Sequence, residues 1–134
     1  MTPEQQATAR ACIAAAHDDS MAFPEIVGTL IAAGFEGYGI DYRRGTATYY
    51  LPDGDSLELA SGRGPVAPQF DQPAVQAAIC EAQANGPGYS YDGFCRKVMA
   101  AGCAGYITSF SGRRVVYFGR DAELHVEHFP AAPN

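Results

Sequence analysis

Residues 32–38 read AAGFEGY, and residues 100–106 read AAGCAGY. The second stretch follows the first by 68 positions, and at the same spacing Tyr49 meets Tyr117. A repeat of this length determines the architecture, because each copy is then one structural unit that buries its apolar face against the other. We therefore expect a tandem duplication in which two similar halves share one core.

The two repeats lie at about residues 4–59 and 72–128, and each predicts two helices followed by three antiparallel strands. The first helix is expected to begin with Thr2 as its N-cap, Pro3 in its first turn and Gln5 as the capping-box partner of Thr2. We expect this helix to end at about residue 17. Alternating apolar residues predict strands at residues 38–42, 46–51, 57–59, 106–110, 113–118 and 124–126.

The second helix of each repeat has an apolar stripe that suits packing on a sheet. The stripe residues are Ile26, Val27, Leu30 and Ile31 in the first repeat and Phe94, Cys95, Val98 and Met99 in the second. Gly34 and Gly102 end these helices. Leu57 and Leu124 are not at equivalent positions of the two repeats. For both to face the same side of the sheet, the second turn of the later repeat must lose one residue or absorb a bulge.

The sequence predicts one α+β domain over residues 1–134, with residues 60–70 as a Gly- and Pro-containing connector. Neither half alone is long enough to bury a core that would keep it stably folded. We expect helices packed on an antiparallel sheet, with a pseudo-twofold axis between the halves. The strands are expected to form one six-stranded sheet or two facing three-stranded sheets.

Charge and composition exclude several classes of function. The net charge is −6, and an acidic surface disfavours general nucleic-acid binding. The chain has no apolar run of ~20 residues and no recognisable secretory signal, so we expect a cytoplasmic protein without membrane insertion. Cys12, Cys80, Cys95 and Cys103 lack metal-binding spacing and are interpreted as buried free thiols, without a metal or cofactor.

Five segments resemble the YbcV-like family of small bacterial and prophage proteins of unknown function. They are FPEIV at 23–27, TYY at 48–50, MAAGC at 99–103, GRRVVYFGR at 112–120 and HVEHFP at 125–130. Some members of that family are labelled phage envelope proteins. The resemblance covers nearly the whole chain and implies a single compact domain. It transfers no catalytic residue, because the family has no assigned ones.

The segment HVEH at residues 125–128 is the first candidate site. On a strand, His125 and Glu127 point to the same face and His128 to the other. A neighbouring carboxylate orients an imidazole and raises its pKa, so His125 and Glu127 form a candidate acid–base pair. A cross-strand ion pair or a structural histidine explains the same residues, and it is the commoner situation.

A second candidate site is an anion pocket built from arginines. The predicted hairpin ends carry Arg43 and Arg44 in the first repeat and Arg113 and Arg114 in the second. Arg120 follows the next strand, and Tyr117 and His125 complete the candidate pocket. Arginine holds phosphates and carboxylates with a rigid fork of donors. The alternative is that these arginines are solvated, or that they pair with the abundant Asp and Glu residues.

Tyrosines are concentrated on the predicted strands, where a large apolar ring with a polar tip suits a core, a ligand or an interface. The strand tyrosines are Tyr38, Tyr42, Tyr49, Tyr50, Tyr106 and Tyr117. Signatures of nucleotide-binding loops and nucleophile elbows are absent. Residues 61–65, SGRGP, are interpreted as a loop connector rather than a phosphate cradle.

These features favour a non-enzymatic binding or assembly module that recognises a small anionic ligand or a protein partner. The open edges of a duplicated sheet favour a homodimer. One alternative is a small acid–base enzyme in which His125 is the base, Glu127 orients it and Arg113 or Arg120 holds the substrate. A further alternative is a phage-associated structural component, which rests on the family resemblance alone.

Overall fold

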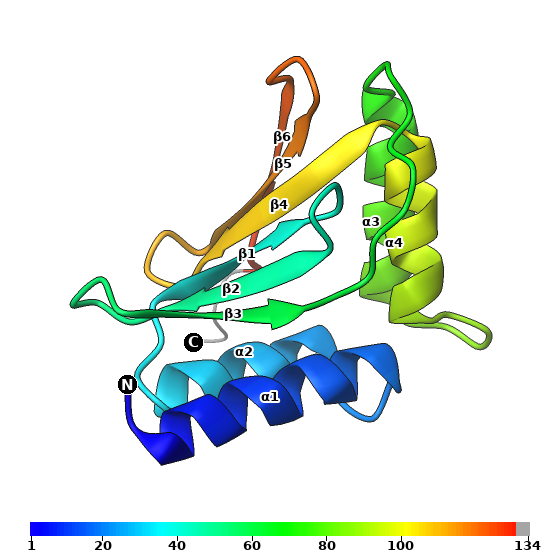
Figure 1. Cartoon of the computed structure of the whole chain (residues 1–134). Helices are drawn as coiled ribbons and strands as arrows, with labels where there is room; N and C mark the ends of the chain where they lie inside the picture. The colour runs from blue at the N-terminus through cyan, green and yellow to red at the C-terminus, as the bar shows by residue number, and fades with distance from the viewer. Residues whose placement is uncertain (131–134) are drawn as a thin grey trace.

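A computed structural model describes residues 1–130. Its elements alternate as two helices and three strands, twice over (Figure 1). The helices are α1 (Pro3–His17), α2 (Phe23–Ala32), α3 (Gln72–Ala84) and α4 (Tyr91–Ala100). The strands are β1 (Gly37–Asp41), β2 (Thr46–Tyr50), β3 (Ser56–Ala60), β4 (Cys103–Ser109), β5 (Arg114–Gly119) and β6 (Leu124–His128). The α+β class and the predicted order of elements are confirmed.

All six strands form a single antiparallel sheet in the order β3-β2-β1-β4-β5-β6. The two strands that follow a helix pair, β1 and β4, lie side by side at its centre. Tyr38 pairs with Thr108 and Ile40 pairs with Tyr106 across this central ladder. Of the two arrangements that the sequence leaves open, the structure therefore adopts the continuous sheet.

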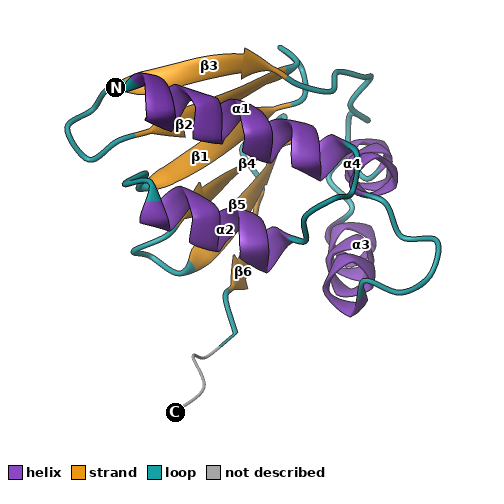
Figure 2. Ribbon diagram, turned by 90° about the horizontal axis from the view of Figure 1, so that it is seen from below, coloured by secondary structure: helices purple, strands orange, loops and turns teal. Residues whose placement is uncertain are grey.

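Both helix pairs cover the same face of the sheet, which we call the inner face. Figure 2 shows α1 and α2 crossing in front of the strands, with α3 and α4 seen nearly end-on beside them. Alternate strand residues point to this face because side chains alternate along a strand. The buried residues of the inner face are Tyr38, Ile40, Ala47, Tyr49, Leu59, Tyr106, Val115 and Tyr117. They form one core cluster with the helices.

Three of the four helices, α1, α3 and α4, begin at short polar side chains that accept hydrogen bonds from free backbone N–H groups, whereas the N-cap of α2 is Ala22, which makes no such bond. The Thr2 side chain accepts from Gln5 N, and the Gln5 side chain accepts from Thr2 N, so the predicted capping box is present. Gln5 also donates to Ala33 O at 3.0 Å and thereby ties α1 to the end of α2. Asp71 and Ser90 cap α3 and α4 in the same way.

The expected adjustment in the second turn of the later half is wrong. Leu57 pairs with Tyr49, and His125 pairs with Tyr117 68 residues later, so β3 and β6 have the same register and neither loses a residue. A register shift does occur, but it lies in β4 between Cys103 and Gly105. Because the second turn keeps its length, His125 and Glu127 of β6 lie on the inner face, while Leu124 and Val126 face outward.

Two of the predicted apolar positions are also corrected. Cys80 is exposed, although its counterpart Cys12 is buried, because α3 turns Val75, Ala78 and Ile79 toward the core instead. Ile31 of the predicted α2 stripe is 51% exposed, whereas Ile26, Val27 and Leu30 of the same stripe are buried. In the part of the chain described, no helix is long and apolar enough to cross a membrane.

Candidate functional site

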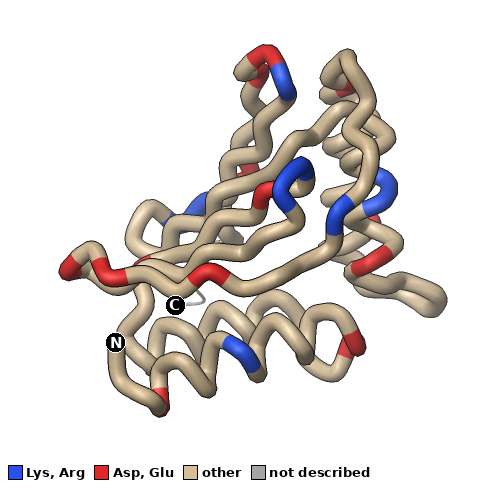
Figure 3. Tube along the Cα trace, in the orientation of Figure 1, with Lys and Arg blue, Asp and Glu red and all other residues tan. Residues whose placement is uncertain are grey.

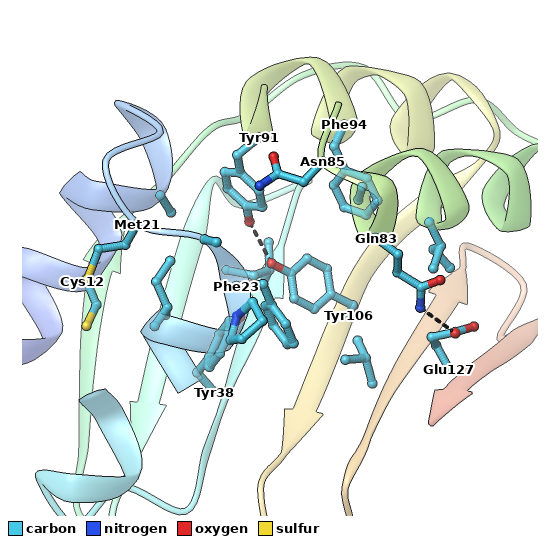
Figure 4. A pocket seen from close by; sticks show the side chains of 18 of the residues that line it. Cys12, Met21, Phe23, Tyr38, Gln83, Asn85, Tyr91, Phe94, Tyr106 and Glu127 are labelled. Atoms are coloured by element: carbon cyan, nitrogen blue, oxygen red, sulfur yellow. Dashed lines mark hydrogen bonds between the residues drawn. The ribbon is translucent and has the colours of Figure 1, made fainter. Parts of the chain in front are cut away.

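The main cavity lies between the two helix pairs, over the inner face of the sheet. Its volume is about 670 Å³, which is within the range of sites for small molecules. It reaches the surface, because exposed residues such as Asp19, Phe23 and Asn85 belong to its lining. Figure 4 shows side chains converging on this space from α1, α2, α3, α4 and the sheet.

Nine Phe and Tyr rings line this space together with aliphatic side chains, and we call it the aromatic cavity. The lining rings are Phe23, Tyr38, Tyr49, Tyr89, Tyr91, Phe94, Tyr106, Tyr117 and Phe129. The Tyr91 and Tyr106 hydroxyls meet at 2.6 Å, joining the start of α4 to the central strand β4 (Figure 4). Such walls favour ligands that bury apolar or aromatic surface and make few polar contacts.

The phenols of the cavity are neutral groups at physiological pH. Burial raises the pKa of the Tyr38 phenol to about 12. Burial also raises the pKa values of Tyr91, Tyr106 and Tyr117 well above the ordinary value, because the charged form loses its water. These hydroxyls therefore act as hydrogen-bond donors and acceptors for a ligand rather than as bases.

A polar corner is formed where α3 meets β6. Glu127 Oε1 accepts a hydrogen bond from Gln83 Nε2 at 2.8 Å, and both residues line the cavity (Figure 4). Asp19 and Asn85 add further polar groups to the lining. The lining contains no Lys or Arg side chain. The cavity is therefore mainly apolar, and its charged groups are the carboxylates of Asp19 and Glu127.

His125 lies behind this corner, not in the cavity lining. Its side chain is 11% exposed, and Nε2 lies 3.7 Å from Glu127 Oε2, beyond hydrogen-bond distance. Gln72 Nε2 lies 3.0 Å from Nδ1 and donates to it, which leaves the imidazole proton on Nε2. That buried Nε2 has no hydrogen-bond partner among residues 1–130. His125 and Glu127 thus share one face, as expected from strand geometry.

The arginines singled out in the sequence do not converge on one pocket, and none of them lines the cavity; Arg113, which precedes Arg114 in the chain, lies over the Phe129 ring at the cavity edge. Arg113 donates to Pro130 O at 2.7 Å, Arg114 donates to Gly112 O at 3.0 Å, and Arg120 donates to Val66 O at 3.4 Å. Figure 3 shows the basic positions scattered over separate turns and helices. Of the residues in the predicted anion pocket, only Tyr117 lines the aromatic cavity. His128 also lines it, at the end of β6.

Several cavity residues lie outside the predicted set. Tyr91 and Phe94 come from α4, Gln83 from α3, Cys12 from α1, and Met21 from the connection between α1 and α2. Nothing in the helical periodicity distinguishes a residue that packs on the sheet from one that faces a gap between two helix pairs. The available signal is Tyr89 and Tyr91, two tyrosines directly before and at the start of a helix, where the predicted sheet does not require them.

A second, shallower groove of about 560 Å³ lies beside the end of β3. Its lining includes Ser61, Arg63, Asp92 and Arg96. His17 at the end of α1 also lines it and lies 2.7 Å from Asp92. Ser61 lines both the groove and the aromatic cavity, so the two spaces meet at this residue. Among residues 1–130, no group of three His, Cys, Asp or Glu side chains is arranged to hold a metal ion.

Comparison with known proteins adds no assignment to this geometry. A scan against protein-family models finds no match. A search of curated proteins finds no similar sequence.

Proposed function

We propose that this protein is a small-molecule binding module whose ligand occupies the aromatic cavity. The observation that carries the proposal is a cavity of about 670 Å³ lined by nine Phe and Tyr rings and by aliphatic side chains, with few charged groups. A core of this size normally fills such a space with side chains, because interiors pack at the density of organic crystals. A cavity held open between two helix pairs is therefore interpreted as a site.

The lining favours an apolar or aromatic ligand over the small anion expected from the arginines. Asp19 and Glu127 carry the negative charges of the lining, and no Lys or Arg offsets them. Desolvating an anion beside a carboxylate is unfavourable. Small-anion or protein-partner binding through Arg113, Arg114 and Arg120 stays a separate proposal, because none of these arginines lines the aromatic cavity.

The test is titration with an environment-sensitive apolar dye, 1-anilinonaphthalene-8-sulfonate or the neutral N-phenyl-1-naphthylamine. We expect the neutral dye to bind with the higher affinity, and we expect Ala82→Leu to weaken it because Ala82 lines the cavity on α3. Ala77→Leu on the exposed side of α3 is the matched control. Binding that is equal in both variants, or absent in the wild type, contradicts the proposal.

We further propose that the two halves arose by tandem duplication and are related by a pseudo-twofold axis. The strand registers support it: Ile40 pairs with Ala47, and the residues 68 positions later, Thr108 and Val115, pair in the same way. The axis would pass between Gly39 and Ile107, which face each other at the centre of the sheet. Halves of an experimental structure that fail to superpose would contradict the duplication.

Membership of the YbcV-like family, a cytoplasmic location and a homodimer remain proposals of ours. The free, buried thiols of Cys12, Cys95 and Cys103 suit a reducing compartment, and cell fractionation tests the location. An apolar patch on the outer face supports the homodimer; it consists of the exposed Ile107, Leu124 and Val126 and the half-buried Val116 and Phe118. Association with phage particles in an induced lysate would instead support a structural role.

An acid–base enzyme is the second candidate. The buried Nε2 of His125, 3.7 Å from a Glu127 oxygen, supports it, because Glu127 borders the cavity in which a substrate would lie. It predicts a turnover that His125→Gln abolishes while the thermal unfolding midpoint stays unchanged. A substrate that turns over equally well with His125→Gln would exclude this role.

A further inference from the structure

Three side chains at the junction of the cavity and the groove are aligned in a chain of contacts. His17 Nδ1 lies 2.7 Å from Asp92 Oδ1, and His17 Nε2 lies 3.3 Å from Ser61 Oγ. His17 ends α1, Ser61 directly follows β3, and Asp92 stands in the first turn of α4. In Figure 1 these three element ends come together on one side of the molecule.

The contacts define the protonation pattern of the imidazole. Asp92 is acceptor-only when ionised, so His17 donates to it through Nδ1–H. The neutral ring then presents an unprotonated Nε2 to the Ser61 hydroxyl, which donates to it. This is the arrangement in which a histidine removes a serine proton and a carboxylate fixes the tautomer of the histidine. The Tyr91 ring packs against the imidazole in an edge arrangement, with the two ring centroids 5.4 Å apart.

The surroundings of Ser61 supply the other parts that acyl transfer requires. The N–H groups of Gly62 and Arg63 take part in none of the hydrogen bonds found within residues 1–130, so they are available as donors to an oxyanion. Arg63 and Arg96 line the groove, where they place positive charge beside the serine. On its other side Ser61 borders the aromatic cavity.

We propose that Ser61, His17 and Asp92 form an acyl-transfer site that hydrolyses carboxylic esters. Ser61 Oγ attacks the ester carbonyl carbon while its proton passes to His17 Nε2. The bond to the alcohol oxygen then breaks, and the leaving alcohol takes the proton from His17. Water, deprotonated by the same Nε2, attacks the acyl-serine, releasing the carboxylic acid and restoring the Ser61 hydroxyl.

The position of Ser61 between the two spaces defines the substrate class. The apolar acyl portion would lie in the aromatic cavity, a part of the inference that rests on the proposed binding function. The alcohol portion would lie in the groove and carry a negative charge, which Arg63 and Arg96 would bind. A carboxylic ester with an apolar acyl group and an anionic alcohol group fits both spaces.

The experiment combines a serine-directed fluorophosphonate with 4-nitrophenyl esters on the full-length protein. Mass spectrometry is expected to locate the fluorophosphonate on Ser61, and Ser61→Ala is expected to remove both the label and the esterase activity. His17→Gln is expected to slow labelling by at least 100-fold, since general-base catalysis contributes a factor on the order of 10²–10⁴. Asp92→Asn is expected to act in the same direction.

Ser111→Ala is the matched control, because Ser111 is an exposed serine in the turn between β4 and β5. Thermal unfolding of each variant separates loss of chemistry from loss of fold. Label on serines other than Ser61, or equal labelling of the wild type and His17→Gln, overturns the proposal. Labelling of Ser61 with no preference for octanoate over acetate esters would retain the triad and remove the acyl role of the cavity.

Discussion

Gly37 and Gly105 each lie against a backbone carbonyl of the opposite central strand. A Cβ atom on Gly37 would lie 2.3 Å from Thr108 O, and one on Gly105 would lie 2.2 Å from Ile40 O. The two glycines are 68 residues apart, and so are the two residues that provide the carbonyls. The β1–β4 ladder that joins the halves therefore depends on two equivalent positions without side chains.

Gly37→Ala and Gly105→Ala are each expected to destabilise the protein by about 2–3 kcal/mol, because the two central strands must separate to admit a methyl group. Urea unfolding followed by circular dichroism measures the change. Gly28→Ala is the control: no atom lies within 4 Å of its added Cβ, and α2 should gain about 0.5–1 kcal/mol. Two strand variants as stable as the wild type would show that the ladder tolerates the methyl group.

The buried tyrosines predict loss of stability in alkali. The folded-state pKa of Tyr38 is raised to about 12, while an unfolded chain releases the same proton near 10. Above pH 10 the unfolded state therefore binds fewer protons than the folded state. The full contribution of the phenol to the free energy of unfolding is present below pH 10, and it is lost as the pH rises toward 12. Each buried phenol contributes about 1.4 kcal/mol per pH unit in this window.

Denaturant unfolding at pH 8, 10 and 11 measures this loss, and absorbance at 295 nm records phenolate formation. Tyr106→Phe is expected to flatten the pH dependence, because Tyr106 is buried at the centre of the sheet. Tyr50→Phe, which removes an exposed phenol, is expected to leave it unchanged. Complete phenolate formation with a native circular dichroism spectrum would contradict the burial of these rings.

Thiol reactivity is expected to distinguish one cysteine from the other three. Cys80 is exposed, whereas burial raises the pKa values of Cys12 and Cys95, and that of Cys103 to about 11. Because the thiolate is the reactive form, Cys103 should react with Ellman's reagent at least about 100-fold more slowly than Cys80. Cys80→Ser should remove the fast phase, and a fast phase that persists would place another thiol at the surface.

The apolar patch on the outer face of the sheet predicts which substitution should dissociate a homodimer. Leu124 is 64% exposed and Ile107 is 54% exposed, and both stand on strands whose outer face is uncovered. Leu124→Glu is expected to shift a homodimer to monomer in sedimentation velocity, since a charge in an apolar interface loses its hydration. Ser56→Glu on β3 is the control at the polar end of the same face. A wild type that is monomeric at 100 μM would remove the homodimer proposal.

Much of the fold follows from local patterns. Thr2 and Gln5 specify the start of α1, and the alternation around Tyr38 and Tyr106 specifies the central strands, because capping and strand periodicity act over a few residues. The orientation of β6 was mispredicted for a physical reason. Leu124 and Val126 alternate as a buried strand does, but the unchanged turn length fixes the register, and it directs His125 and Glu127 inward.

The candidate sites depend on distances between elements that no local pattern encodes. The sequence by itself determined the order of the helices and strands, and the caps and turns that bound them, since these depend on near neighbours along the chain. Only the tertiary structure decided that two helix pairs stand apart over the sheet and leave an aromatic cavity. It also decided that His17 meets Ser61 and Asp92, which are 44 and 75 residues away along the chain, because the packing of separate helices and strands sets such contacts.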